Sequence, residues 1–256
     1  MDIMTILGLV VAFGSIILGY LLAHGSLFAL LKLTAGLIVI GGTLGATAVS
    51  FPSKTLKKMP KVIGLAFKKK EFNLEQHISY FKEISLKTRR DGLLSLESEL
   101  SEDLDPFTRK GLQMVVDGIE PSSVKSILNT KLENLVSRHD DCIEMFSAAG
   151  GYAPTMGIVG TVTSLVIVLA NLNDPSSMGG EIASAFVATL YGLGTANLFW
   201  LPIASKLKEI NKAEIIEKEM IIEAVLLIQE GVNPNTLVSK LVGYLTEDEA
   251  KLLEEI

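Results

Sequence analysis

Cysteine is almost absent from this chain of 256 residues, which contains one, Cys142. A single cysteine excludes an internal disulfide and any metal site built from several thiolates. The three histidines, His24, His77 and His139, lack the spacing of metal ligands. The sequence also contains no nucleophile elbow, phosphate-binding loop or metal cluster. We therefore expect no enzyme activity, no catalytic residue, no bound metal and no cofactor.

A surplus of basic residues is absent as well. The chain contains 29 acidic and 23 basic residues, which gives a formal net charge of -6. Proteins that bind duplex nucleic acids use a basic patch to displace counterions. The composition therefore excludes a nucleic-acid partner.

Charge is nearly absent from four long stretches, although 20% of all residues are charged and 48% are hydrophobic. The mean hydropathy of +0.42 does not fit a soluble protein with that much charge. At 1.5 Å per residue, each stretch is long enough to cross a hydrocarbon layer of about 30 Å. The sequence thus predicts an integral membrane protein with four transmembrane helices, and the four stretches cover residues 3–22, 27–49, 150–172 and 182–203.

Basic residues beside the apolar stretches predict their orientation. Lysines are concentrated after the second and fourth stretches, and cytoplasmic flanks carry an excess of Lys and Arg. The short loops around His24 and Asp174 are then expected outside, and both termini inside the cell. The lysines in question are Lys54, Lys57, Lys58, Lys61, Lys68, Lys69 and Lys70, followed later in the chain by Lys206, Lys208 and Lys212.

The polar segments have helical patterns, and no strand pattern of useful length occurs, so the predicted fold is all-α. We expect transmembrane helices 1 and 2 in residues 1–50 and a cytoplasmic helical domain in residues 51–149. Transmembrane helices 3 and 4 are expected in residues 150–203, and a cytoplasmic helical tail in residues 204–256.

Several residues predict where the polar helices begin and end. Asp105 before Pro106 is typical of a helix start, and Gly118 of a helix end. A second helix begins at Pro121 and is expected to continue into the third span. The tail carries similar signals: a stop at Gly231, a start at Asn233 and Pro234, and a capping box formed by Thr246 and Glu249.

The predicted spans contain no Asp, Glu, Arg or His away from their ends. Because an ion relay normally requires an ionisable group within the bilayer, this chain alone offers none. Small residues are common instead, among them Gly41 and Gly45 in a G-x-x-x-G pattern, and most of them predict close helix packing.

Polar groups and prolines of the third and fourth spans match in depth. Thr161 and Thr189 fall near the middle of the bilayer, and Pro154 and Pro202 near its cytoplasmic side. A membrane helix tolerates proline where the freed carbonyl finds another partner. Static kinks with hydroxyls bonded to their own helix explain the pattern equally well.

A charged stretch of the cytoplasmic segment also has helical spacing. Glu83, Arg90 and Glu97 fall on one face of a continuous helix, with Arg89 at its flank. The apolar side of that helix is expected to consist of Leu86, Leu93, Leu96 and Leu100. Such charges usually form a solvated surface that contributes little energy.

Three motifs, "GLLSLE", "APTMGIVGTV" and "ATLYG", occur in an order that resembles the motility protein A (MotA/PomA) family of flagellar stator subunits. The resemblance covers nearly the whole chain. It implies a homopentamer in the bacterial cytoplasmic (inner) membrane around a pair of MotB-type helices. That partner is a single-span protein anchored to peptidoglycan, and its aspartate carries the ion. Ion flux then generates torque on the rotor protein FliG.

The resemblance also implies roles for individual residues. Pro154 and Pro202 match the conformational prolines of the family. Thr189 matches a threonine of the ion pathway, with Tyr191 beside it. Thr161 is shared with sodium-driven relatives, whereas some proton-driven relatives carry Ala at this position. The expected ion is the proton, with sodium as the alternative. The rotor-contact residues are Arg89 and Glu97, with Arg90 next to the former.

An energiser of the ExbB/TolQ kind is the alternative function. Those proteins typically have one span before the cytoplasmic insert, whereas this chain has two. A self-contained transporter is a further class, but it would be expected to carry its own charges or unwound helix pairs within the membrane.

Overall fold

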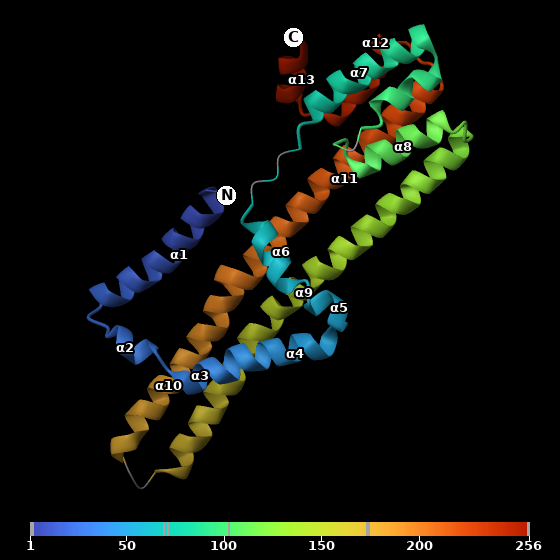
Figure 1. Ribbon diagram of the computed structural model, residues 1–256. Helices are drawn as coiled ribbons and strands as arrows, with labels where there is room; N and C mark the ends of the chain where they lie inside the picture. Colours follow the sequence, from blue (N-terminus) through green and yellow to red (C-terminus); the bar gives the residue numbers. More distant parts are fainter. Residues whose placement is uncertain (1–2, 69, 71, 102, 173–174, 255–256) are drawn as a thin grey trace. The chain divides into compact units, whose positions relative to one another are not determined.

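The computed structural model describes residues 3–68, 70, 72–101, 103–172 and 175–254. Every regular element among these residues is a helix (Figure 1), which confirms the predicted all-α fold. The chain forms two compact units. We call Met1–Lys69 with His139–Glu209 the span unit, and Lys70–Arg138 with Ile210–Ile256 the head unit.

Four helices are long and apolar enough to cross a membrane, as the sequence predicts. They are Ile3–Leu22, Leu27–Ser50, Pro121–Ala170 and Met178–Gln229. The first is α1, in which no residue is buried. Because its side chains are almost all apolar, this helix presents a surface suited to lipid or to another protein.

The second span is not the continuous α-helix that its apolar sequence predicts. It consists of α2 (Leu27–Leu30), α3 (Leu33–Gly36), the π-helix η1 (Leu37–Gly41) and α4 (Gly42–Ser50). Between α2 and α3, Leu31 and Lys32 have extended backbone angles. Such a break is tolerated at membrane depth only where the freed backbone groups find partners.

The third and fourth spans belong to much longer helices. Helix α9 (Pro121–Ala170) has 50 residues and confirms that the helix begun at Pro121 continues into the third span. The fourth span comprises α10 (Pro175–Thr195), the π-helix η3 (Ala196–Trp200) and the first part of α11 (Leu201–Gln229). The predicted loop at Asp174 lies outside the described residues.

Two short helices, α5 (Ser53–Leu56) and α6 (Met59–Ala66), follow the second span. Val62 and Ala66 of α6 pack in a core cluster with Phe146 and Trp200. The ring centroids of Phe146 and Trp200 lie 6.0 Å apart. This cluster gives the span unit a packed centre where α6, α9 and η3 meet.

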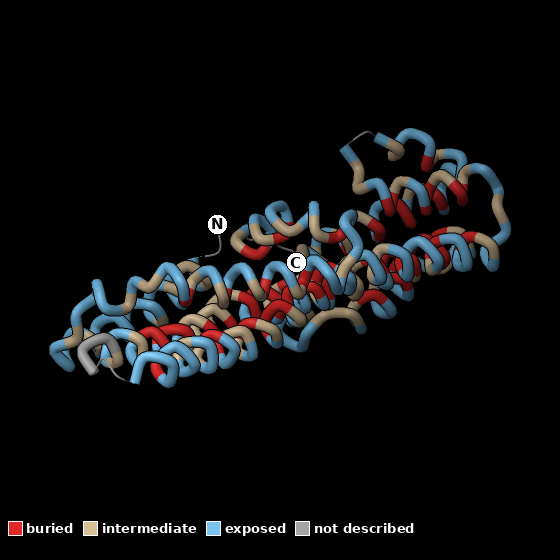
Figure 2. Tube along the Cα trace, turned by 90° about the horizontal axis from the view of Figure 1, so that it is seen from below, coloured by how far each residue is buried: buried red, intermediate tan, exposed pale blue. Residues whose placement is uncertain are grey.

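The head unit contains α7 (Leu74–Asp91), the 3-10 helix η2 (Leu93–Glu99), α8 (Pro106–Val116), α12 (Pro234–Leu241), η4 (Val242–Tyr244) and α13 (Glu247–Glu254). Parts of α9 and α11 complete it. Figure 2 shows buried residues in short stripes along the helices, separated by exposed ones. Phe81, Leu112 and Leu227 are among the buried side chains of its core.

The predicted helix ends are confirmed. The Asp105 carboxylate accepts hydrogen bonds from the amides of Phe107 at 3.2 Å and Thr108 at 3.0 Å. Gly118 and Gly231 end their helices with φ angles of 71° and 68°, which a residue with a side chain rarely adopts. Asn233 caps α12, and Thr246 with Glu249 forms the capping box of α13.

Candidate functional site

Helices α9 and α10 approach each other so closely that only glycine fits at the crossing. A Cβ atom on Gly192 would lie 2.7 Å from the Ala153 carbonyl oxygen and 3.0 Å from the Gly157 Cα. A Cβ atom on Gly157 would lie 3.1 Å from the Ala188 carbonyl oxygen. Close backbone contact of this kind is typical of small residues in membrane helix pairs.

This crossing brings Thr161 and Thr189 together. Their hydroxyl oxygens lie 2.5 Å apart. The Thr161 hydroxyl is also 3.1 Å from the Gly157 carbonyl of its own helix and 3.1 Å from the Ala185 carbonyl of α10. Both threonines are half-buried. The two hydroxyls thus share one level, as their depth in the sequence predicts, and the Thr161 hydroxyl contacts both helices.

The resulting cluster consists of oxygen atoms from two hydroxyls and two carbonyls. Such oxygens suit a hard cation or a hydrogen-bonded water chain. None of these groups titrates near neutral pH, so the cluster cannot carry a proton by itself. Within the described part of the chain, no three His, Cys, Asp or Glu side chains are placed to hold a metal ion.

Tyr191 lies two residues after Thr189 but makes a different contact. Its hydroxyl donates a hydrogen bond of 2.6 Å to the carbonyl of Leu30. Leu30 is the last residue of α2, where the second span is interrupted. Tyr191 therefore satisfies a backbone group at that break and links α10 to the second span. Its role in an ion pathway stays a prediction.

Both prolines lie beside a second close contact between long helices. Gly150, four residues before Pro154, has so little space that an added Cβ would lie 2.5 Å from Leu201 Cδ2. Leu201 directly precedes Pro202, and the π-helix η3 ends at Trp200. Proline lacks an amide hydrogen and leaves a carbonyl of the preceding turn without its usual donor. The two prolines do not share one level, so this prediction was wrong: Ala153, which precedes Pro154, faces Gly192, ten residues before Pro202 on the opposite helix.

The charged stretch of the head unit differs from its prediction. Helix α7 ends at Asp91, and Gly92 turns the chain with a φ angle of 83°. Glu97 follows in the 3-10 helix η2, so it does not share a continuous helix face with Arg90. The prediction of one continuous helix across this segment was therefore wrong, because Gly92 interrupts the helix.

Arg89, Arg90 and Glu97 are all exposed at this turn. Arg90 donates two hydrogen bonds to Asp91, at 2.9 and 2.8 Å. These hydrogen bonds, together with the positive charge of Arg90, hold the pKa of Asp91 below its usual value. The structure leaves the three predicted rotor-contact residues accessible on one short segment.

The neighbouring leucines do not all form the expected apolar side. Leu96 is buried in the head-unit core, whereas Leu86 is 54% exposed and Leu93 is 37% exposed. Lys87 of α7 joins the two helices across the turn, because its ammonium lies 2.6 Å from Glu99 of η2. The 3-10 helix directs its side chains differently from the α-helix that the spacing assumed.

An ionic cluster in the head unit was missed by sequence reasoning. The buried Lys218 ammonium lies 3.1 Å from carboxylate oxygens of both Asp105 and Glu217. Glu217 also lies 3.0 Å from the His77 ring. The Asp105 cap was the signal that the sequence offered, since His77, Asp105 and Lys218 come from distant positions in the chain.

The cluster shifts the pKa values of its members. Burial raises the pKa of Asp105, but the Thr108 amide and the Lys218 ammonium outweigh burial and hold it below its usual value. Burial likewise raises the pKa of Glu217, and His77 with Lys218 outweighs it, so that this pKa is lowered. Burial lowers the pKa of Lys218, and the two carboxylates outweigh it and raise this pKa.

Known proteins resemble this chain over its full length. A model of the motility protein A N-terminal region matches residues 6–92, and a model of the MotA/TolQ/ExbB proton channel family matches residues 99–220. Motility protein A of Bacillus subtilis (strain 168) is 37% identical over 257 aligned residues, which cover 100% of this chain and 95% of that protein. The chain belongs to the motility protein A family.

Solved structures agree with this assignment. MotAB from C. jejuni is 34% identical, with a TM-score of 0.91 and 97% of both chains covered. The flagellar MotAB stator complex from Bacillus subtilis is 36% identical, with a TM-score of 0.91, 97% of this chain covered and 98% of the other. The motility protein A N-terminal match includes both spans before the insert, which favours this family over the ExbB/TolQ alternative. The chain is thus a flagellar stator subunit of the inner membrane and not an enzyme.

Proposed function

We propose that five copies of this chain surround a pair of MotB-type helices and form an ion channel whose flux drives rotation. The partner is a single-span protein anchored to peptidoglycan. Torque acts on the rotor protein FliG. In this arrangement each chain crosses the inner membrane four times and keeps both termini in the cytoplasm. The head unit is then cytoplasmic, in agreement with the lysines after the second and fourth spans.

The Thr161 and Thr189 pair is the observation that carries this proposal. It supplies a polar level within an otherwise apolar crossing of α9 and α10. Because this level contains oxygens and no titratable group, conduction needs an acid from a second protein. A MotB-type aspartate supplies the missing group.

Ion flux through reconstituted protein tests this division of roles. The chain alone should conduct nothing, and the complex with its partner should conduct. Thr189→Ala in the complex should reduce flux, whereas Thr163→Ala serves as the matched control. The exposed Thr163 hydroxyl donates a hydrogen bond to the Val159 carbonyl of its own helix. Flux through the chain alone that Thr189→Ala abolishes would contradict the proposal.

We propose the proton as the transported ion, with sodium as the alternative. Swimming speed measured over a series of sodium concentrations at fixed pH distinguishes the two. A proton-driven motor keeps its speed without sodium. Speed that vanishes without sodium would overturn the assignment, and Thr161→Ala should then impair sodium use more than assembly.

Pro154 and Pro202 are proposed to permit a change in helix geometry during conduction. They flank the close contact of Gly150 with the Leu201 side chain, since Pro202 directly follows Leu201 and Pro154 lies about one helical turn after Gly150. Replacing either proline by alanine restores a backbone donor and should slow flux and rotation together. Retention of normal flux and rotation would remove them from the mechanism.

Arg89, Arg90 and Glu97 are proposed as the contact with FliG. Exposed charges of both signs suit a transient contact that is steered electrostatically. Arg89→Glu combined with Glu97→Lys should weaken rotation and leave ion flux unchanged, with Lys125→Glu on an exposed part of α9 as control. Normal swimming of the double variant, or loss of flux in step with torque, would exclude this role.

A further inference from the structure

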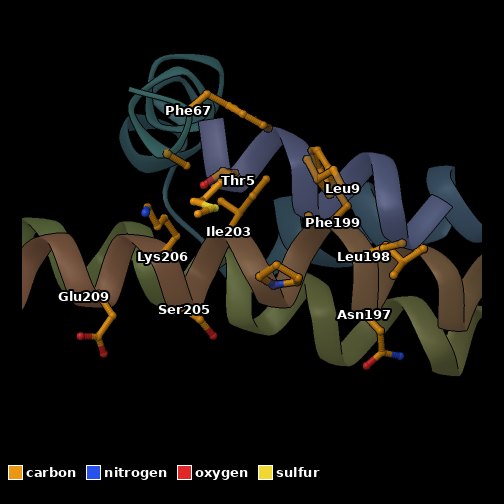
Figure 3. A pocket seen from close by; sticks show the side chains of 15 residues that line it. Thr5, Leu9, Phe67, Asn197, Leu198, Phe199, Ile203, Ser205, Lys206 and Glu209 are labelled. Atoms are coloured by element: carbon orange, nitrogen blue, oxygen red, sulfur yellow. The ribbon is translucent and has the colours of Figure 1, made fainter. Parts of the chain in front are cut away.

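The span unit contains an open cavity of about 460 Å³. One wall is the N-terminal half of α1, and the opposite wall is formed by η3 and the start of α11 (Figure 3). Phe67, which directly follows α6, closes one side. The volume is within the range of small-molecule sites, and the cavity is open rather than enclosed by the core.

The walls of this cavity are mainly apolar. Gly8 and Leu9 contribute from α1, and Phe199 and Ile203 contribute from the opposite side. An apolar cavity of this size favours an apolar occupant over water, because water there would find few hydrogen-bond partners. Since α1 has no buried residue, lipid tails have access to its surface.

Charge is distributed unequally around the cavity. Figure 3 shows Lys206 directed toward the side of α1, whereas Ser205 and Glu209 of α11 and Asn197 of η3 point away from α1. Two further lysines close to Phe67 in sequence are exposed. They are Lys61 of α6 and Lys68, which follows α6. Basic residues at the cytoplasmic membrane surface attract anionic headgroups.

We propose that this cavity binds one acyl chain of an anionic phospholipid from the cytoplasmic leaflet, with the headgroup beside Lys206. The leaflet follows from the membrane orientation in the proposed function, on which this part of the inference rests. Pro202 lines the cavity, so the bound chain contacts the fourth span where η3 gives way to α11. The lipid thereby becomes part of the packing around a proposed conformational proline.

Two glycines of α1 allow a matched test. A Cβ atom on either Gly8 or Gly14 has no heavy atom within 4 Å, but only Gly8 lines the cavity. Gly8→Leu therefore fills the cavity, and Gly14→Leu adds the same side chain to the same helix elsewhere. Ala12→Leu, also in the cavity wall, is a second filling variant in case Gly8→Leu does not assemble.

The experiment uses the complete complex of this chain with its partner, transferred into nanodiscs of phosphatidylglycerol and phosphatidylcholine in equal amounts. Native mass spectrometry then counts the lipids that remain on the released complex. We expect about one phosphatidylglycerol per copy, reduced at least tenfold by Gly8→Leu or Ala12→Leu and unchanged by Gly14→Leu. Lys206→Gln should keep a bound lipid but lose the preference for phosphatidylglycerol.

Equal retention in the cavity-filling variants would overturn the inference. A second copy fills the cavity instead if the unaltered complex binds no lipid and the cavity-filling variants change the number of chains per complex. Lipid retention is measured independently of flux and rotation. A complex that conducts without retaining lipid refutes only the lipid site, and one that retains lipid without conducting refutes only the proposed function.

Discussion

The head unit and the span unit bury their apolar side chains in different ways. In the head unit, Phe81, Leu112 and Met220 are fully buried within one continuous core. In the span unit, α1 buries nothing, and Phe186 of α10 is 72% exposed. The head unit thus closes its own core, whereas the span unit leaves apolar surface that lipid or other chains must cover.

The two units also differ in how they satisfy polar groups. The head unit uses full charges, as in the contact of Lys218 with Asp105 and Glu217. The span unit uses hydroxyls and carbonyls, as in Thr161 with Thr189 and Tyr191 with Leu30. We therefore expect pH and charge changes to act on the head unit, and changes of volume to act on the span unit.

The largest expected effect is that of Gly192→Leu in the span unit. Its side chain would overlap the Ala153 carbonyl and the Gly157 backbone, which cannot move away as a flexible side chain could. Overpacking costs about 1–3 kcal/mol even in cores that can adjust. We expect loss of assembled complex, measured by its yield on size exclusion. Gly194→Leu is the control, since nothing lies within 4 Å of its Cβ position, and equal loss there would contradict the explanation.

Lys218→Met tests the charged centre of the head unit. The change leaves the carboxylates of Asp105 and Glu217 without their shared cation. Breaking a buried ion pair on one side costs about 3 kcal/mol. Thermal unfolding of the head-unit helices should shift downward by several degrees. Lys240→Met, which removes an exposed pair with Glu223, should cost less than about 1 kcal/mol, and equal shifts would show that burial is not the cause.

The same cluster predicts a pH dependence of head-unit stability. The lowered pKa values of Asp105 and Glu217 stabilise the fold above the unfolded values of about 4, and this contribution is lost as the pH falls through the folded values. The raised pKa of Lys218 stabilises the fold at pH values below the unfolded value of about 10.4, and this stabilisation is lost as the pH rises through the folded pKa. Unfolding by denaturant at several pH values measures both limbs. Lys218→Met should weaken both, and unchanged limbs would contradict the assignment.

The smallest effect is expected for Tyr191→Phe. The change removes one hydrogen bond to the Leu30 carbonyl and keeps the ring. A net hydrogen bond contributes about 1 kcal/mol, and the carbonyl can regain a water where the break is accessible. A slight decrease in the thermal midpoint of the complex should follow, with assembly retained. A decrease as large as that of Gly192→Leu would mean that this contact determines the helix arrangement.

Local signals made most helix ends predictable. Asp105, Asn233 and Thr246 act through hydrogen bonds to amides two or three residues away, so sequence alone contains both partners. The apolar stretches likewise fixed the number of spans, because length and composition determine whether a helix can cross a membrane.

Contacts between distant segments were not predictable in the same way. The residues around Lys218 in sequence do not identify Asp105 as its partner. The residues around Leu31 likewise do not indicate that Tyr191 stabilises a break there. The prediction that Thr161 and Thr189 lie at the same depth was confirmed, because both depths could be counted in residues from the loop that joins the third and fourth spans. Their roles in conduction stay predictions.

The π-helices η1 and η3 have a consequence for helical phase. A π turn holds more residues than an α turn, so side chains beyond it are rotated relative to those before it. Gly41 and Gly45 have open space around them, while Gly42, the first residue after η1, would place a Cβ 2.6 Å from the Met156 sulfur. Conversion of either π turn to an α turn would rotate the following segment by about 100° per residue gained or lost. The second and fourth spans therefore each contain a position where the phase of one half can change against the other.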